Sequence, residues 1–551
     1  MMQHLLTLSL AASLTLGQAT LNEDARASED GRPAPAAERF GANYRDHLDG
    51  WWQDAVFYEI FVRSFGDSSE GPLANDGVGD LAGLIERLDY LNDGDPSTDT
   101  DLGVTALWLM PIMQSPSYHG YDTVDYRAID DEYGTNEDFK RLVRECERRG
   151  IRVVIDFVIN HSSSDHEWFQ AAQDPSSPFR DWYVWQDAHP GWKGAWGQDV
   201  WHESQADDGS HYFGLFWHGM PDLNMRHEAT TREVFDITRF WMEEMGVAGF
   251  RLDAIRHLIE DGQIQENTPE THAWLRRFWA FTKSIDQRCF TVGEVWADSD
   301  AVSRYVGDQM DVGFEFDVCY RLIDAVRERR AQPMIDQLAL LDEKYPLGMY
   351  ATFLRNHDQP RTLHELGGDR VGAKLAAAIQ LCLPGVPFIY YGEEIGMTAD
   401  KPDPNLRTPM QWQAPSRHGA GVGFTMAEEP WKAAQPDAET INVAMQLDDP
   451  HSMLSHYRRL IQARHAHEAL RTGELEVIDT GHESLLAFVR SNDSQRLLCL
   501  FNLSDDPVSG YDLGLEGAIG DDVLTGEPLA GDAAKPMPQL AARSAWIIEL
   551  R

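Results

Sequence analysis

Charged residues follow several short apolar runs of this chain at positions two residues apart. Arg251 and Asp253 end the run "GFRLD", residues 249 to 253. In a β-strand, residues two apart point to the same face, so these two side chains can share charge. A buried charge without a partner costs several kcal/mol or more. Two ionised groups at the end of an apolar run therefore predict a functional site there.

Three other runs end in the same way. They contribute Asp156, Asn160 and His161 in "DFVINH", Glu294 in "TVGEVW", and Asn356, His357, Asp358 and Arg361 in "FLRNHDQPR". Carboxylates gathered on one rim suit cleavage of a glycosidic bond. One ionised carboxylate attacks or stabilises an oxocarbenium-like carbon, while a second stays protonated until it releases the leaving oxygen.

The electrostatics of such a rim favour this chemistry. Burial and a nearby like charge raise the pKa of the acid, and a guanidinium beside the nucleophile keeps that carboxylate ionised. The alternative is a set of buried ion pairs that tie strands together. A single strand end does not decide between the two.

The segments that must position these residues alternate between β-type and helical stretches from residue 54 to about 395. The β-type runs are 56–62, 105–110, 151–157, 247–252, 290–293, 311–316, 349–354 and 386–391. Strands that alternate with helices are typical of parallel sheets with crossover helices. Eight of them predict an α/β fold with a closed (β/α)8 TIM barrel, in which catalytic groups sit just past the carboxyl ends of the strands.

Two further parts interrupt and follow the barrel. The connection after the third run, residues 161–224, is dense in Trp, His, Gly and Asp and is too long for an ordinary loop, so we expect an inserted domain. The barrel then comprises residues 49–160 and 225–449. Alternating segments such as "SLLAFVR" predict a C-terminal helix and an antiparallel β-sandwich domain over 450–551.

The N-terminus is typical of an exported protein. An apolar run, Leu5 to Leu16, precedes the small residues "GQA" and predicts a signal peptide over residues 1–19. Residues 20–48 are rich in Ala, Pro, Glu and Asp, and we expect a disordered leader. The protein is then secreted or periplasmic, without membrane insertion after cleavage. The five cysteines lie mostly in apolar segments and predict free, buried thiols.

The charge balance limits the partners. The chain has 551 residues, with 47 Lys and Arg against 90 Asp and Glu and a net charge of −43. Nucleic acid and anionic membranes need a basic surface, so they are excluded as partners. We expect a monomer without an organic cofactor.

Taken together, the strand ends resemble the conserved regions of the α-amylase family of glycoside hydrolases, in the family's order, from about Trp52 to Trp412. The resemblance implies a retaining mechanism on α-glucosidic bonds. In it, Asp253 is the nucleophile, Glu294 the general acid/base and Asp358 the carboxylate that grips ring hydroxyls of the distorted sugar. The resemblance places further residues around that sugar: Tyr121, His119 and Asp122 in "SYHGYD", with His161, Arg251 and His357.

Other segments are informative about the branch of the family. "MPDLN" (220–224) is similar to a sequence intermediate between those of the oligo-1,6-glucosidase-like and neopullulanase-like branches. The group that carries this intermediate sequence contains many bacterial α-amylases. "RTPMQW" (407–412) and "LNDGDPSTDTDLGVTALWLMPI" look like the same group. The resemblance thus implies an α-amylase that cleaves α-1,4-glucosidic bonds in starch-type glucans and maltooligosaccharides through a covalent intermediate.

Three alternatives stay open. The first is an exo-acting α-glucosidase or oligo-1,6-glucosidase, because Asp122 and Arg407 match positions that close the pocket beyond the first sugar in exo enzymes. The second is a transglycosylase of the trehalose synthase type, which uses the same carboxylates and differs in how it excludes water. The third is a non-catalytic binding protein, although such relatives usually lack one or more of the three carboxylates.

The resemblance also implies Ca²⁺. "NDGVGD" (75–80) looks like the tail of an Asp-rich calcium loop, here preceded by an insertion, "SSEGPLA". The expected ligands are Asp67, Asp76, the carbonyl of Val78, and Asp80. Asn160 and the backbone of His257 match a second calcium site found in many α-amylases. The alternative for the first loop is a plain turn of Asx and glycine residues.

Overall fold

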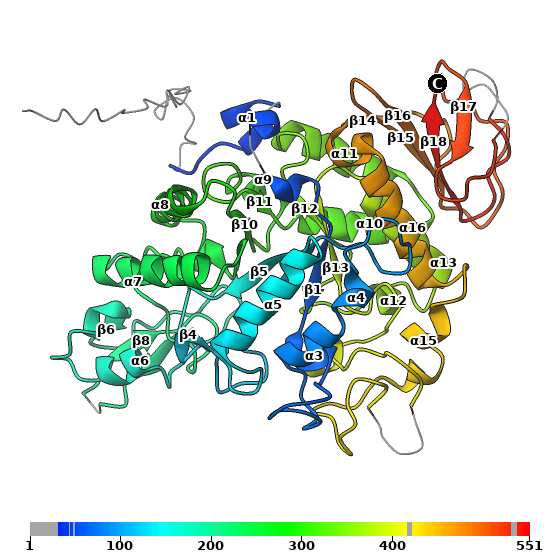
Figure 1. The fold of residues 1–551 in the computed structure, drawn as a ribbon. Coiled ribbons are helices and arrows are strands. Elements are labelled where there is room, and N and C mark those ends of the chain that lie inside the picture. The colour runs from blue at the N-terminus through cyan, green and yellow to red at the C-terminus, as the bar shows by residue number, and fades with distance from the viewer. Residues whose placement is uncertain (1–30, 43, 48–49, 207, 416–420, 530–536) are drawn as a thin grey trace, which may run out of the picture.

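Eight short parallel strands form a barrel in the computed structural model, which describes residues 31–551 apart from 43, 48–49, 207, 416–420 and 530–536 (Figure 1). The strands are β1 (Phe57–Ile60), β2 (Ala106–Leu109), β5 (Arg152–Phe157), β9 (Gly249–Leu252), β10 (Phe290–Gly293), β11 (Val312–Gly313), β12 (Ala351–Thr352) and β13 (Val386–Tyr390). Their order is β11-β10-β9-β5-β2-β1-β13-β12, and a parallel bridge between Phe314 and Ala351 joins the two ends. The predicted barrel is confirmed, and each strand lies within one of the predicted runs.

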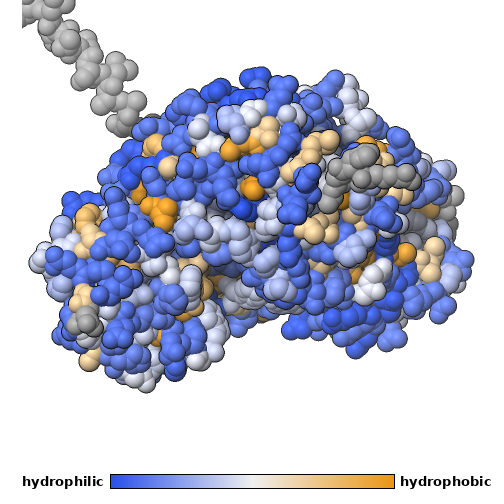
Figure 2. Space-filling view, turned by 90° about the horizontal axis from the view of Figure 1, so that it is seen from below, coloured by the Kyte–Doolittle hydropathy of each residue, from blue (hydrophilic) through white to orange (hydrophobic). Residues whose placement is uncertain are grey.

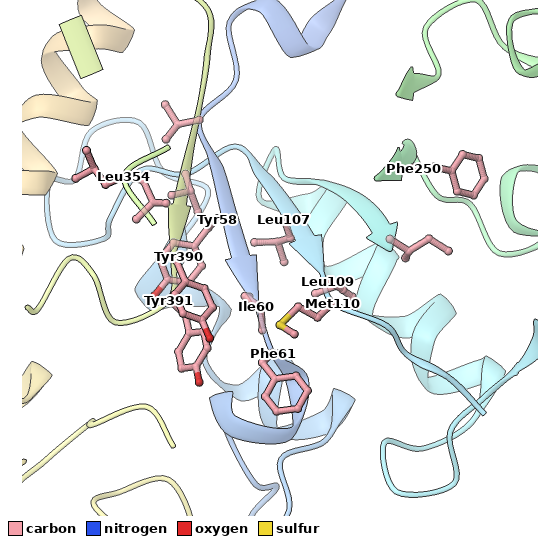
Figure 3. Packing of buried hydrophobic residues seen from close by; sticks show 14 of the residues in the cluster. Tyr58, Ile60, Phe61, Leu107, Leu109, Met110, Phe250, Leu354, Tyr390 and Tyr391 are labelled. Atoms are coloured by element: carbon pink, nitrogen blue, oxygen red, sulfur yellow. The ribbon is translucent and has the colours of Figure 1, made fainter. Parts of the chain in front are cut away.

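The strands are buried on both faces, which explains their nearly continuous apolar sequences. Figure 3 shows part of the larger core, with Tyr58 and Ile60 of β1 beside Leu107 and Leu109 of β2. A second cluster, which includes Phe57, fills the barrel interior. Close packing also explains the glycine that begins "GFRLD".

A Cβ at Gly249 would lie 2.0 Å from the carbonyl oxygen of Phe290 on the neighbouring strand. Any side chain at this position would therefore push β9 and β10 apart. The register matters for the site as well, because β9 places Arg251 level with Asp156 of β5.

Helices cover the outside of the barrel. The longer ones are α5 (Asn136–Arg148), α7 (Glu228–Arg239), α8 (Pro269–Ile285), α10 (Phe316–Glu328), α11 (Gln332–Lys344) and α13 (Arg370–Cys382). Short ones include α2 (Val62–Phe65), α3 (Leu81–Glu86), α4 (Leu88–Leu91), α9 (Ser299–Ser303), α12 (Thr362–Glu365), α14 (Asp403–Leu406) and α15 (Val443–Gln446). Helix α5 shows the local cause: Thr135 and Asp138 form a capping box, and the residues buried along one face are Phe139, Leu142, Val143 and Cys146.

The inserted segment after β5 has a small sheet of its own. Following α6 (Glu167–Ala172), strands β6 (Trp185–Gln186), β7 (Trp201–Glu203) and β8 (His211–Phe213) pair in the order β6-β8-β7. A bridge between His161 and Asp222 joins the two ends of the segment next to the barrel. Nearby, β3 (Met113–Gln114) and β4 (Asp125–Ile129) form a hairpin that follows β2.

The C-terminal part begins with α16 (Met453–Ala466) and α17 (Glu468–Thr472). Strands β14 (Glu474–Val477), β15 (Leu485–Ser491), β16 (Arg496–Asn502), β17 (Ile519–Asp522) and β18 (Ala545–Leu550) follow, all paired antiparallel. The antiparallel domain is confirmed, but the predicted β-sandwich is corrected to one five-stranded sheet in the described residues. Side chains such as Phe488 face the main core, while Val508 and Leu540, in connections between strands, cover the other face. A second sheet is therefore not needed to bury that face.

The N-terminal leader departs from the prediction. The signal peptide (1–19) and the first part of the leader lie outside the described residues. Residues 36–40, however, form α1 (Ala36–Phe40), so the prediction of disorder is wrong there. Arg39 Nη1 lies 2.6 Å from Asp308 Oδ1, and the hydroxyl of Tyr44 donates to the carbonyl of Gly307 at 3.1 Å. These contacts with the barrel offset the entropy lost when the segment is ordered.

Two predictions about bulk properties can be compared with the structure. All five cysteines are free and buried, as predicted. None of the helices described for this chain combines the length and the apolarity that a membrane span requires. The face seen in Figure 2 is mostly hydrophilic, as expected for a net charge of −43.

Candidate active site

Arg251 lies at the centre of the candidate site. Its Nη1 lies 2.8 and 3.0 Å from the two carboxylate oxygens of Asp156 and 2.7 Å from Asp253 Oδ1. Its Nη2 lies 3.0 Å from Glu294 Oε2. The side chain is only 1% exposed. A planar and permanently charged guanidinium can pair with several carboxylates at once, so the ends of β5, β9 and β10 share one cation.

The carboxylates around the site differ in their pKa values. Burial raises the pKa of Glu294 to about 7, and the attraction of Arg251 offsets this only in part. Burial also favours the neutral form of Asp358, but His357 and Arg407 hold the pKa of Asp358 well below its ordinary value. At neutral pH, the ionised carboxylate of Asp358 therefore lies near Glu294, which still carries its proton for part of the time. Such a division suits acid-assisted bond cleavage.

Asp253 is linked to Glu294 by a hydrogen bond from the backbone of the next residue as well as by Arg251. Burial raises the pKa of Asp253, and the contact with Arg251 opposes this by favouring the ionised form. The next residue, Ala254, has a φ of 49°, in the left-handed region that residues other than glycine seldom adopt. Its N–H donates to Glu294 Oε2 at 3.1 Å. The strained turn thus helps to fix the distance between the two carboxylates.

Tyr121 and His357 stack beside this cluster. Their ring centroids are 5.7 Å apart, and their planes differ by 15°. The hydroxyl of Tyr121 lies 2.6 Å from His357 Nε2 and donates to Asp156 Oδ2 at 3.1 Å. His357 Nδ1 lies 2.5 Å from Glu59 Oε1. The strand-end pattern contains Asp156 without assigning it a role, and it misses Glu59, for which the available signal is a lone acidic residue inside an apolar strand.

A pocket of about 660 Å³ opens over Tyr121 and the carboxylates of Asp253, Glu294 and Asp358. The residues predicted for catalysis and substrate binding that line it are Asp253, Glu294, Asp358, Tyr121, His119, His161 and Arg407. Exposed tryptophans extend the wall: Trp196 is 60% exposed, and Trp217 and Trp296 are each 44% exposed. Flat apolar faces with a polar edge suit sugar rings. Sequence reasoning missed these three because the chain contains 17 tryptophans and a local pattern does not say which are exposed.

Three of the predicted substrate-binding residues differ from one another in the groups that they contact. Arg407 Nη2 lies 2.8 Å from Asp358 Oδ1. His161 Nε2 lies 3.0 Å from the carbonyl oxygen of Tyr121, and burial lowers the pKa of His161 to about 4, so the ring is neutral. Asp122 lies beside the pocket wall: its Oδ1 accepts a hydrogen bond from the Ser115 hydroxyl at 2.8 Å.

The loop predicted to bind calcium uses its carboxylates as hydrogen-bond acceptors. Asp67 accepts two backbone N–H groups at 2.8 and 2.9 Å, and Asp80, at the start of α3, accepts two at 2.8 and 3.1 Å. Asp76 Oδ1 accepts the N–H of Val78 at 2.9 Å. In the described part of the chain, no group of three or more His, Cys, Asp or Glu side chains is placed to hold a metal ion. The loop fits a hydrogen-bonded turn better than a calcium site.

The residues predicted for a second calcium ion lie near a further buried carboxylate, that of Asp222. The amide of Asn160 donates to the backbone carbonyl of His257 at 2.9 Å. Asp222, in "MPDLN", is 2% exposed, and burial raises its pKa well above the ordinary value. Its Oδ2 has no hydrogen-bond partner among the described residues. An unpaired buried carboxylate oxygen is costly, and a hard cation would satisfy it. The sequence did not single out Asp222.

Comparison with known proteins gives consistent matches. Residues 59–473 match the family model described as alpha amylase, catalytic domain. The chain is 36% identical over 461 residues to alpha-amylase 3 of Dictyoglomus thermophilum, covering 82% of this chain and 85% of that protein. It is 32% identical over 536 residues to the oligo-1,6-glucosidase of Heyndrickxia coagulans, covering 83% and 93%. The crystal structure of the alpha-amylase from H. orenii matches with a TM-score of 0.81 at 38% identity, covering 90% of this chain and 99% of that one.

Proposed function

The chain belongs to the α-amylase family of glycoside hydrolases, and we propose that it cleaves α-1,4-glucosidic bonds in starch-type glucans and maltooligosaccharides. One observation carries the proposal: Asp253 and Glu294 converge on Arg251 inside a pocket with an aromatic rim, and the pKa of Glu294 is raised to about 7. The resemblance to an α-amylase at 36% identity supports the substrate class.

The mechanism divides the work between two carboxylates. Asp253 attacks the anomeric carbon while Glu294 gives its proton to the leaving glycosidic oxygen, which produces a covalent glucosyl-enzyme. Glu294, now a carboxylate, then takes a proton from water, and the water releases the sugar with its configuration retained. Arg251 favours the ionised form of Asp253, which the attack requires.

The remaining residues bind and orient the sugar. Asp358 stays ionised between His357 and Arg407, so it can accept hydrogen bonds from ring hydroxyls. Tyr121 offers an aromatic face, and His161 is a neutral neighbour in the same wall. In this proposal, Asp122 acts on the sugar only indirectly, because its carboxylate binds Ser115 beside the wall.

A second candidate is an exo-acting α-glucosidase or oligo-1,6-glucosidase. It is favoured by Arg407, which lies 2.8 Å from Asp358 and 3.9 Å from Asp403 and so fixes a cation beside the carboxylate that would bind the terminal sugar. The 32% identity to an oligo-1,6-glucosidase points in the same direction. A transglycosylase would use the same three carboxylates. A non-catalytic role is disfavoured because Asp253, Glu294 and Asp358 all line the pocket.

The product profile on soluble starch, pullulan, cyclodextrin and maltose tests these proposals. An α-amylase acting within chains rapidly shortens starch to a range of oligosaccharides. Glucose as the sole product, released from chain ends, would reject that mode in favour of the exo candidate. Isomerised disaccharide from maltose would indicate a transglycosylase, and the absence of turnover on every substrate would reject both hydrolases.

We also propose a calcium site, which adds Asp222 to the predicted Asn160 and His257, and export of the protein. Calcium would be held by Asn160, Asp222 and the backbone carbonyl of His257, where its charge would tie the inserted segment to the barrel. Export through the signal peptide of residues 1–19 would yield a secreted or periplasmic enzyme. Sequencing the N-terminus of the mature protein tests the second proposal, since cleavage after residue 19 is expected.

A further inference from the structure

Glu59 is a buried carboxylate that the proposed mechanism does not use. It lies on β1, in the apolar sequence "FYEIF", and is 2% exposed. A charge in such a strand is costly unless it is paired. Its Oε1 lies 2.5 Å from His357 Nδ1, on the segment that follows β12 and carries Asp358. The barrel thus pairs a carboxylate of its first strand with an imidazole that touches the pocket carboxylate Asp358.

The hydrogen bonds around His357 determine where its protons lie. Nε2 lies 2.6 Å from the hydroxyl of Tyr121 and 3.1 Å from Asp358 Oδ2. The single proton of the Tyr121 hydroxyl goes to Asp156 Oδ2, at 3.1 Å. The Tyr121 oxygen is therefore an acceptor toward His357, and Nε2 must donate. Nδ1 faces the carboxylate of Glu59, which only accepts hydrogen bonds, so a ring that carries a proton on both nitrogens satisfies all these contacts.

The other groups packed against this ring are consistent with that state. Trp108 of β2 meets it edge-on, with the centroids 5.6 Å apart, and the guanidinium of Arg407 donates to the backbone carbonyl of His357 at 3.2 Å. Burial alone would lower the pKa of His357, but Asp358 and Glu59 together raise it to about 9. Tyr390 of β13 lies level with Glu59 in the sheet and contributes a neutral hydroxyl at ordinary pH.

We propose that Glu59 is a positioning residue that keeps His357 doubly protonated over the working pH range, so that the imidazolium orients the Tyr121 hydroxyl and holds Asp358 ionised. Glu59 itself touches no substrate in this proposal. Through Tyr121 and Asp156, the same hydrogen-bond chain continues to Arg251, the partner of the proposed nucleophile. The inference rests on the proposed glycosidase function for its kinetic readout, but not for its spectroscopic one.

The variant Glu59→Gln tests the proposal because the amide has the same shape without the charge. Its amide can donate to Nδ1, which leaves His357 neutral. An opposite charge within about 4–6 Å shifts a pKa by about 1–3 units, so we expect the pKa of His357, followed by NMR titration, to fall by about that much in the variant. The variant should lose kcat/KM relative to the wild type at the pH values where its ring has lost the second proton. Activity at pH 5, where the ring regains its proton, should be largely restored. The matched control is Glu394→Gln, another buried carboxylate, which binds the hydroxyls of Tyr58 and Tyr90 and does not contact His357.

A direct measurement makes the test independent of folding of the variant. In the wild-type protein labelled with ¹⁵N-histidine, the NMR signals of His357, assigned with His357→Gln, should show both nitrogens protonated at pH 8. A neutral His357 at that pH would overturn the proposal whatever Glu59→Gln does. An equal loss of activity at every pH, with the pKa of His357 unchanged in the variant, would show a merely structural role and would also overturn it. If the enzyme turned over no α-glucan but the imidazolium were observed, the proposed function would fail while the pairing stood.

Discussion

Glu294 has a raised pKa although Arg251 lies 3.0 Å from its carboxylate. A cation at this distance favours the ionised acid, yet burial outweighs the attraction, and the pKa rises to about 7. Arg251 also contacts Asp156 and Asp253, so its charge is shared among three carboxylates. Beside Arg251, Glu294 is thus an acid that remains protonated under mildly acidic conditions.

Replacement of either proposed catalytic carboxylate should abolish most of the turnover without unfolding the protein. Glu294→Gln removes the proton donor, and general acid catalysis is worth about 10²–10⁴-fold. Asp253→Asn removes the nucleophile and should lower kcat by at least a similar factor. Initial rates on maltooligosaccharides and the melting temperature measure the two effects. The control is Glu315→Gln, a buried acid outside the pocket whose pKa burial raises to about 8, and its rate should be near that of the wild type. Wild-type rates in either site variant would refute the assignment.

The pH dependence should reveal the raised pKa of Glu294. Activity requires its protonated form, so kcat/KM should fall as pH rises through about 7. The same shift affects stability. Because the folded pKa lies above the ordinary value of 4.5, Glu294 contributes stability that is fully present below about pH 4.5 and is lost as pH rises through 7. The melting temperature of wild type minus that of Glu294→Gln should therefore be more positive at pH 4.5 than at pH 8. A difference that does not vary with pH would show that the pKa is not raised.

Arg251 should be essential for stability as well as for catalysis. Arg251→Met leaves the buried Asp156 without its cation, and breaking a buried pair in this way costs about 3–5 kcal/mol. The free energy of unfolding from urea titrations at pH 7 measures the loss. The loss should shrink at pH 4, where the carboxylates left behind can take up protons. Equal stability of variant and wild type at pH 7 would contradict the central role of the guanidinium.

Metal removal should distinguish the two predicted calcium sites. If calcium binds at Asp222, chelation lowers the melting temperature of the wild type, and Asp222→Asn lowers it without further effect of the chelator. Asp76→Asn should keep the response to the chelator, because the Asp76 carboxylate accepts a hydrogen bond within its turn. If no metal binds, chelation leaves the melting temperatures of the wild type and of Asp222→Asn unchanged. A midpoint that chelation does not move would count against calcium at both sites.

Trp196 should contribute to substrate binding and little to folding. Its side chain is 60% exposed in the pocket wall, so Trp196→Ala removes a sugar-binding face while leaving the core intact. If stacking contributes about 1 kcal/mol, the KM for maltooligosaccharides rises about fivefold, with a smaller change in kcat. Met426→Ala serves as control, because Met426 is 80% exposed and is not among the residues that line the pocket. Equal KM values for both variants and the wild type would exclude a binding role for Trp196.

Much of the barrel could be predicted because its signals are local. Each of the eight strands lies within a predicted apolar run, and the alternation with helices is sufficient to identify the fold. The residues predicted from strand ends, such as Asp156 and Arg251, meet because parallel strands end on the same side of a barrel. Sequence reasoning was weaker where a segment has no period of its own. It assigned disorder to residues 36–40, which form a helix that contacts the barrel through Arg39 and Asp308.

The sequence by itself determined which chemical groups are present, their order along the chain and the strands that carry them, because apolar periodicity and strand-end charges are properties of neighbouring residues. Only the tertiary structure decided which groups meet. Glu59 contacts His357 across 298 positions of sequence, and Asp222 is left with an unpaired oxygen among the described residues. Barrel register and burial create these relationships, and with them the pKa of Glu294. Both depend on how distant segments pack, which no local pattern encodes.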